Sequence, residues 1–174
     1  MTRPKSGNRA AGFTLVELVA VMLIGAILMA IAIPAYQSQI RKSRRTDAKT
    51  ALLDLAAREE KYFSLNNTYT VSPANLGYVA AGSGAVFPQV VGSGYYQVYV
   101  CVASVSGSTS TVTACSATSA AAGGTSYIVS ALPVATSTQA NDTQCQYFAV
   151  DNTGTQFSSS TGGVGANTTS VCWH

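Results

Sequence analysis

The chain has 174 residues, of which 47% are hydrophobic and only 10% carry a charged side chain. Its ten Lys and Arg residues all lie at or before Lys61, and beyond that position the only side-chain acids are Asp142 and Asp151. These charges argue against a phosphate-binding second half. The single histidine is the last residue, so the sequence predicts no enzyme, no catalytic residue and no cofactor.

The first twelve residues carry three cations and no acid, and they end in the small residues Ala10, Ala11 and Gly12. An ordinary secretory signal places its apolar region before the small-residue cleavage site. Here the small residues come first, so a cut after Gly12 would leave the apolar segment on the mature chain, which would begin at Phe13. Removal of this leader would lower the formal net charge from +3 to about zero.

One carboxylate, Glu17, interrupts an otherwise uncharged run from Gly12 to Ile40. An ionised Glu in hydrocarbon costs roughly 2–3 kcal/mol or more, so it is kept where it has a partner or a task. In the first turn of a helix it meets the partial positive charge of the helix N-terminus, and the Phe13 amine would lie one turn away. We expect Glu17 to pair with that amine on a neighbouring parallel helix, which would set the register between chains.

The segment Gly12-Phe-Thr-Leu-Val-Glu17, followed by Pro34 within the apolar helix, resembles the N-terminus of type IV prepilins. The resemblance extends roughly through Tyr69. It implies that a membrane prepilin peptidase cuts after Gly12 and methylates the new amine of Phe13, and that Glu17 is the assembly carboxylate. The implied partners are the peptidase, the inner membrane, and other pilin subunits in a homo- or hetero-filament.

The apolar segment from Phe13 to Ala35 has about 23 residues, or about 34 Å of helix, which is enough to cross a bilayer. Pro34 removes one helical hydrogen bond and clashes with the carbonyl of Ala30, which predicts a kink or local melting during filament packing. A transmembrane proline without such a role is equally compatible. The resemblance implies a cytoplasmic leader and a single pass through the inner membrane, with a periplasmic head before assembly and an extracellular pilus afterwards.

Apolar residues continue to recur at helical spacing beyond the membrane segment. No Gly or Pro interrupts the chain from Ala35 to Thr70, and Asp54 and Arg58 have the spacing of a favourable i,i+4 pair. We therefore expect one continuous helix of about 50 residues whose second half, 36–65, is amphipathic. Its apolar stripe consists of Ile40, Ala48, Leu52, Leu55, Ala56 and Tyr62.

The basic cluster, residues 41–45, follows the membrane segment directly and reads Arg-Lys-Ser-Arg-Arg. Clusters of this kind suit anionic lipid or nucleic acid. Its position beside the membrane segment favours a role at the bilayer surface or in filament packing over DNA capture.

Residues 66–174 form the predicted head, which is rich in Ser, Thr, Ala, Gly and Val. After a connecting region, 66–94, the pattern predicts strands at residues 95–105, 111–118, 126–132, 145–151 and 155–158, with a hairpin turn at 151–154. The expected fold class is α+β, in which a long N-terminal helix packs on an antiparallel sheet of four to five strands, the pilin fold. The expected division is a leader (1–12), a membrane and assembly helix (13–35), an amphipathic helix half (36–65) and the head (66–174).

Four cysteines lie in the head, Cys101, Cys115, Cys145 and Cys172. None forms a C-x-x-C pair, so no metal site is predicted. An even number of cysteines in an exported domain indicates disulfides, and three pairings are possible. We favour Cys101–Cys115, closing a hairpin between neighbouring strands, and Cys145–Cys172, pinning the C-terminal segment to the sheet. The second resembles the disulfide-bounded C-terminal loop of many pilins.

The resemblance implies a structural subunit of a type IV pilus that serves adhesion, twitching motility or DNA uptake. The ending Cys172-Trp173 resembles the PilE-like branch of minor pilins. A type II secretion pseudopilin is one alternative, although pseudopilins of the major type resemble calcium-binding heads without disulfides. A competence pilin that binds DNA through its head is the other.

Overall fold

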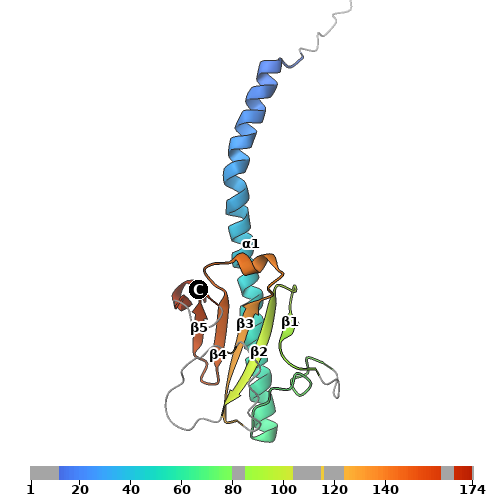
Figure 1. Ribbon diagram of the computed structural model, residues 1–174, viewed down its shortest axis with the longest axis vertical. Helices are drawn as coiled ribbons and strands as arrows, with labels where there is room; N and C mark the ends of the chain where they lie inside the picture. The colour runs from blue at the N-terminus through green and yellow to red at the C-terminus, as the bar shows by residue number, and fades with distance from the viewer. Residues whose placement is uncertain (1–11, 80–84, 104–114, 116–123, 162–166, 174) are drawn as a thin grey trace, which may run out of the picture. The chain divides into compact units, whose positions relative to one another are not determined.

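The computed structural model describes residues 12–79, 85–103, 115, 124–161 and 167–173. The chain forms two compact units, Met1–Ile40 and Arg41–His174. The first unit holds the N-terminal part of one long helix. The second holds the rest of that helix together with a β-sheet (Figure 1).

Helix α1 runs over Leu15–Asn66 and has 52 residues. Thr14 caps its start, because its Oγ1 accepts a hydrogen bond from the Glu17 backbone N–H at 3.2 Å. Pro34 lies inside α1, so the helix continues past it. At the other end Asn67 adopts a φ of 53°, a left-handed conformation that asparagine tolerates and that ends the helix. The single long helix predicted from the sequence is confirmed.

Five antiparallel strands form one sheet in the order β1-β2-β3-β4-β5. Their bounds are β1 Gln89–Val91, β2 Tyr96–Ala103, β3 Ser126–Pro133, β4 Tyr147–Asp151 and β5 Gln156–Ser159. Two short helical segments, η1 (Thr138–Asn141) and α2 (Thr169–Cys172), complete the described head.

Four of the predicted strands correspond to β2, β3, β4 and β5, whereas β1 was assigned to the connecting region and that assignment is wrong. β1 has only three residues and follows Pro88, so it carries no alternating pattern of its own. It exists because Gly92 and Gly94, at φ of 55° and 83°, return the chain to pair with β2. The strand predicted at 111–118 lies outside the described residues except for Cys115, which belongs to no strand.

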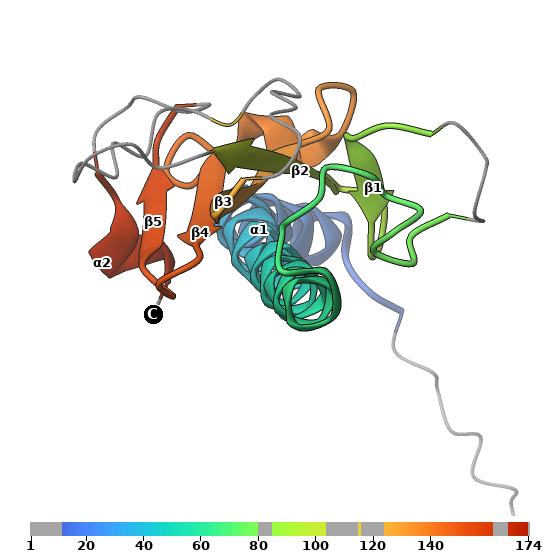
Figure 2. The ribbon, with the colours of Figure 1, turned by 90° about the horizontal axis from the view of Figure 1, so that it is seen from below.

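The second half of α1 covers one face of the sheet (Figure 2). Ala48, Leu52 and Leu55 are fully buried there, against alternating residues of β2 such as Val98 and Val100. The predicted apolar stripe, apart from Ile40, is therefore the core face of the helix. The same row of α1, at helical spacing, begins with Arg45 and ends with Glu59, and both of these charged residues are also buried.

Candidate functional site

The residues predicted for processing and assembly lie at the start of α1. Gly12, Phe13 and Glu17 are all exposed, and the side chain of Phe13 is 85% accessible. Within the described part of the chain, the Glu17 carboxylate has no ion pair or hydrogen bond. Residues 1–11 lie outside the described residues. The start of α1 thus presents a capped helix end with one unpartnered acid.

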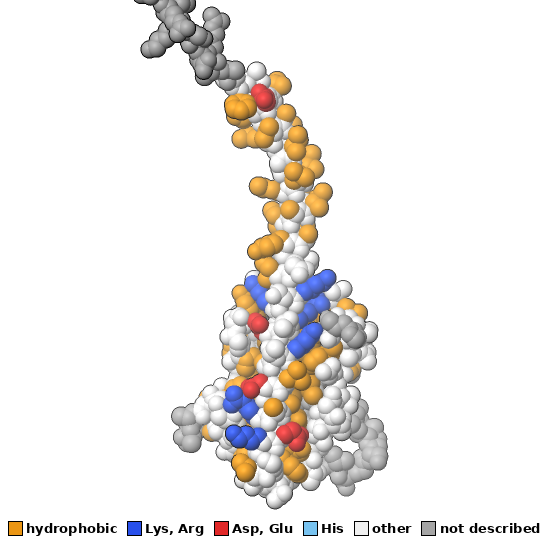
Figure 3. All heavy atoms as spheres, turned by 180° about the vertical axis from the view of Figure 1, so that it is seen from behind, with side chains coloured by type: hydrophobic (Ala, Val, Ile, Leu, Met, Phe, Trp, Pro, Cys, Tyr) orange, Lys and Arg blue, Asp and Glu red, His pale blue; other side chains and the backbone are white. Residues whose placement is uncertain are grey.

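The N-terminal part of α1 exposes apolar side chains along its length (Figure 3). By length and composition α1 is the one helix in the described ranges able to cross a membrane, and its most apolar 18-residue stretch is not buried at all. A surface of this size requires lipid or other helices to cover it. Its large members are Leu15, Val16, Leu18, Val19, Val21, Met22, Leu23, Ile24, Ile27, Leu28, Met29, Ile31, Ile33 and Tyr36.

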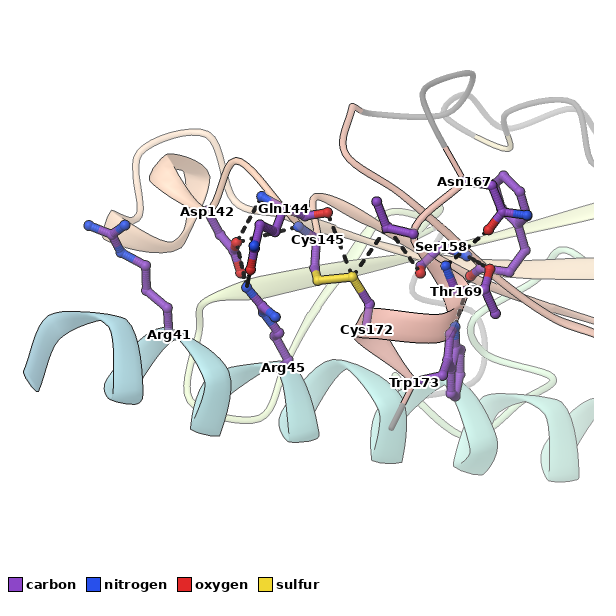
Figure 4. Close-up of a disulfide and its surroundings, with 12 residues drawn as sticks. Arg41, Arg45, Asp142, Gln144, Cys145, Ser158, Asn167, Thr169, Cys172 and Trp173 are labelled. Atoms are coloured by element: carbon purple, nitrogen blue, oxygen red, sulfur yellow. Dashed lines mark hydrogen bonds and ion pairs between the residues drawn. A yellow bond between two sulfur atoms is a disulfide. The ribbon is translucent and has the colours of Figure 1, made fainter. Parts of the chain in front are cut away.

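In the second unit, Arg45 joins α1 to the segment before β4 (Figure 4). Its Nε donates to Asp142 Oδ2 at 2.7 Å and its Nη2 donates to Asp142 Oδ1 at 2.8 Å. Asp142 also accepts hydrogen bonds from the Gln139 amide and from the backbone N–H groups of Gln144 and Cys145. Both members of the ion pair are buried. These two hydrogen bonds hold the segment that leads into Cys145 and β4 against α1.

Two further arginines of the basic cluster contact the same segment. The Arg44 guanidinium lies 3.7 Å from the centre of the Tyr95 ring, and its Nη1 donates to Thr138 Oγ1 at 2.7 Å. Arg41 Nη1 donates to the carbonyl of Asn141 at 3.4 Å. Lys42 is exposed. Three of the four cations in this cluster therefore bind the head itself. The sequence offered no signal for these contacts, because the partners lie about 50 to 100 residues away along the chain.

The structure joins Cys145 to Cys172 and Cys101 to Cys115, which is the pairing favoured from the sequence. The expectation that Cys115 joins neighbouring strands is wrong. Cys115 belongs to no strand: its N–H donates to the Tyr147 hydroxyl and its carbonyl accepts from the Ser130 hydroxyl. Ser130 pairs with Tyr99, on the side of β2 away from α1. The first disulfide thus fastens residue 115 over the outer face of the sheet.

The Cys145–Cys172 disulfide works together with hydrogen bonds from α2. Thr169 Oγ1 accepts from the Ser158 N–H at 2.9 Å, and the Trp173 indole N–H donates to the carbonyl of Phe157 at 3.0 Å. The Trp173 ring also packs edge-on against Phe148. The C-terminal segment is therefore attached both to β5 and to the start of β4.

Glu59 is a fully buried acid at the end of the core row of α1. Its Oε2 accepts a hydrogen bond from the Thr70 N–H at 3.2 Å, while its Oε1 has no partner. Burial, and to a smaller extent the nearby charge of Glu60, raises the pKa of the Glu59 carboxyl to about 7. No local pattern indicates this burial, since two adjacent acids on a helix are typical of a solvated face.

Replacing Glu59 by glutamine is expected to stabilise the protein above neutral pH by about 3 kcal/mol. An unfolded glutamate loses its proton near pH 4.5, whereas folded Glu59 holds it until about pH 7. The folded state therefore binds more protons in this window, and its stability falls as the pH rises from about 4.5 to 7. Urea unfolding of the detergent-solubilised chain at several pH values measures this. If Glu59→Gln shows the same fall as the parent, the carboxyl is not the cause. The control is Asp54→Asn, at an exposed position of the same helix, which should keep the fall.

The described residues contain no group of three or more His, Cys, Asp or Glu side chains that could hold a metal ion. The described residues offer an exposed apolar helix with one acid at its start, and a head whose strands and C-terminal segment are fastened to the same helix.

Two family models match the chain. Residues 34–149 match the model described as type IV minor pilin ComP, DNA uptake sequence receptor. Residues 7–33 match the prokaryotic N-terminal methylation motif. The second match covers Gly12, Phe13 and Glu17, the residues on which the prediction of an assembly helix rests.

Several known proteins are similar to parts of the chain. The type IV major alpha-pilin of Moraxella bovis is 41% identical over 81 residues, which are 42% of this chain and 50% of that protein. Prepilin peptidase-dependent protein D of Escherichia coli K12 is 55% identical over 40 residues, which are 23% of this chain and 27% of that protein. The chain spans about half, or less, of the length of these relatives.

Among solved structures, a type IV pilin from Shewanella oneidensis has 20% sequence identity and a TM-score of 0.38, over 67% of this chain and 89% of that one. The family of this chain is therefore identified from the sequence comparisons. Because the model for residues 34–149 spans more than half of the chain and meets the methylation motif directly upstream, this chain belongs to the family described as type IV minor pilin ComP, DNA uptake sequence receptor, a family of type IV pilins.

Proposed function

We propose that this protein is a structural subunit of a type IV pilus that assembles through the N-terminal half of α1. The observation that carries the proposal is the exposed apolar part of α1, which lies largely within the match to the methylation motif and contains one acid, Glu17. The similarity of the chain to a type IV major alpha-pilin and to a prepilin peptidase-dependent protein supports it.

Processing between Gly12 and Phe13 by a prepilin peptidase would release the Phe13 amine, which the peptidase would then methylate. The amine and the Glu17 carboxylate would lie one helical turn apart in a single chain. In a bundle of parallel helices, Glu17 of one subunit can reach the amine of its neighbour. In a low-dielectric core, a subunit in the wrong register leaves both charges unpaired, so the ion pair selects one register.

Before assembly, the apolar part of α1 would cross the inner membrane once and the head would lie in the periplasm. During assembly this part would leave lipid and pack against other helices in the filament core. A loss of helical hydrogen bonding near Pro34 would let the helix adjust to its neighbours. The subunit would then be part of an extracellular pilus that serves adhesion or twitching motility. The ComP match and the Cys172-Trp173 ending favour a minor subunit.

Replacing Glu17 by glutamine is expected to lower the amount of this protein in sheared pili by about tenfold or more, because one ion pair worth about 1.4 kcal/mol is lost per subunit. The measurement is the ratio of the protein in sheared pili to that in membranes. Glu60→Gln makes the same chemical change at an exposed acid of the head and should leave the ratio unchanged.

Mass spectrometry of the membrane-extracted chain tests the processing step. A mature chain that begins with a methylated Phe13 supports the proposal. An intact leader in cells with active peptidase contradicts it, as does a Glu17→Gln protein that enters pili as readily as its parent. The abundance of the parent in the pili separates a minor subunit from a major one.

DNA binding is a second candidate function, which the description of the matching family favours. The small number of unpaired cations in the described residues limits how tightly this chain can bind DNA. In the described part of the second unit, Arg41–His174, the cationic side chains without a hydrogen bond or ion pair to a described residue are those of Lys42, Lys49 and Lys61. Burial lowers the pKa of Lys49. Three lysines can neutralise at most about three phosphates.

We therefore expect the detergent-solubilised chain to retain little duplex DNA at about 0.15 M salt, with a log–log salt slope no steeper than about −3. Titrations of fluorescent duplex DNA at several salt concentrations measure this slope. Tight binding with a steeper slope would show that the protein binds DNA through a surface that these lysines do not form.

A further inference from the structure

Most charged side chains in the described part of the second unit, Arg41–His174, form ion pairs or hydrogen bonds with other residues of that unit. Arg45 and Asp142 bind each other, and Asp151 accepts hydrogen bonds from the turn that follows it. Asp47 and Lys61 are two side chains of opposite charge on α1 that lie outside these pairs, as Lys42 and Lys49 also do. Asp47 accepts a hydrogen bond from the Ser93 hydroxyl but has no cationic partner, and Lys61 has no hydrogen bond or ion pair with any described residue.

Asp47 lies in a groove of about 460 Å³ between α1 and the β1 region. One wall comes from α1 and includes Asp47 and Ala51, and the other includes Tyr78, Val90 and Val91. Asp54 lines the groove as well, but its carboxylate is paired with Arg58, so Asp47 is the acid of the lining without an ion pair to a described residue. The lining thus combines this carboxylate with apolar side chains, and Val90 is 61% exposed. A lysine suits such a groove, because its apolar stem can lie along the apolar wall while its ammonium group meets the carboxylate.

Lys61 lies two heptads after Asp47 on the same side of α1, about 21 Å further along the helix. It is exposed and borders a second hollow together with Leu65, one turn further on. Leu65 is 74% exposed. Lys61 and Leu65 therefore present a cation beside a large apolar side chain at this end of α1. The groove presents the complementary combination, the acid Asp47 beside the apolar Val90.

We propose that Lys61 and Leu65 of one subunit dock into the Asp47 groove of a second copy of this chain. The contact is heterologous, since it joins two different surfaces, and repetition of such a contact produces an open helical filament. Two α1 helices side by side without an axial shift would bring like charges together. A shift along the helix of about 21 Å brings Lys61 of one copy to Asp47 of the other.

This inference rests on the proposed assembly into a filament and adds a second determinant of register, in the head. Glu17 acts at the start of α1 between chains offset by about one helical turn, whereas this contact acts between chains offset by about 21 Å, so the two contacts join different pairs of neighbours. Figure 3 shows acidic and basic side chains along the exposed face of α1 in the head. The two determinants can be tested separately, because Glu17 takes no part in the groove.

Charge reversal tests the electrostatic part. Asp47→Lys alone and Lys61→Asp alone are each expected to lower the amount of the chain in sheared pili by about tenfold, and the double variant is expected to recover most of it. Lys42→Asp is the matched control, since it makes the same charge change at an exposed position on another side of α1. Equal losses in Lys42→Asp and Lys61→Asp, or no recovery in the double variant, would overturn the contact. Unchanged amounts of oxidised protein in membranes show that each variant folds.

Disulfide trapping tests the geometry. Chains with Asp47→Cys and chains with Lys61→Cys are expressed together, and sheared pili are run on a non-reducing gel. A disulfide-linked dimer that requires both variants supports the contact, whereas mixing Asp47→Cys with Lys42→Cys should yield none. If the variants enter the pili and no dimer forms, this contact is wrong while the proposed function stands. If the parent chain itself is absent from pili, the proposed function fails and the contact with it.

Discussion

Replacing Arg45 by alanine is expected to lower the free energy of unfolding by about 3–5 kcal/mol. The change removes a guanidinium that makes two hydrogen bonds to Asp142, at 2.7 and 2.8 Å. Asp142 is only 3% exposed, so its carboxylate would remain buried without its cationic partner. The loss arises mainly from this uncompensated charge, and only partly from the contact itself.

Urea unfolding of the detergent-solubilised chain, followed by circular dichroism, measures the effect. Arg45→Lys should recover only part of the loss, because an ammonium group cannot reproduce the two parallel hydrogen bonds. The control is Asp54→Ala, which breaks the exposed ion pair between Asp54 and Arg58 and should cost about 0.5 kcal/mol or less. A loss of similar size in Arg45→Ala and Asp54→Ala would show that burial of the Arg45 pair has little energetic weight.

Removing the Cys145–Cys172 disulfide by replacing both residues with alanine is expected to lower the free energy of unfolding by about 3–4 kcal/mol. The two cysteines are 27 residues apart, so the bridge restricts a sizeable loop in the unfolded chain. Both sulfur atoms are buried in the folded protein, which is why alanine is preferred to serine, whose hydroxyl would lack partners. The same unfolding measurement reports the change.

The Cys101–Cys115 bridge is the matched comparison, because it closes a shorter loop with a separation of 14 residues. Its removal should cost slightly less, about 3 kcal/mol. Loss of the longer bridge should also expose the C-terminal segment to added protease, although Trp173 keeps its hydrogen bond to Phe157. A double alanine variant of Cys145 and Cys172 that unfolds at the same urea concentration as the parent would show that α2 is held by its hydrogen bonds and ring contacts alone.

The parts of the fold predicted correctly depend on neighbours a few residues apart. The start of α1 follows from the segment that leads to Glu17, and its length beyond Pro34 follows from the lack of Gly and Pro up to Asn67. In the sheet, alternation in β2 and the turn at Gly154 predicted strands at the right places. Helical periodicity, strand alternation and turn residues are local properties, so a single sequence carries them.

The parts that were missed depend on residues distant in sequence. β1 is a strand only because β2 lies beside it, and Cys115 lies on the outer face of the sheet because Ser130 and Tyr147 bind it there. Local patterns alone predict the long apolar helix and the α+β fold class. Only the folded chain reveals that Arg45, in a basic cluster, is buried against Asp142, 97 residues away, and that Glu59 is buried as well. Burial and pairing of a charge depend on which distant segments fold against it, and no local pattern encodes that.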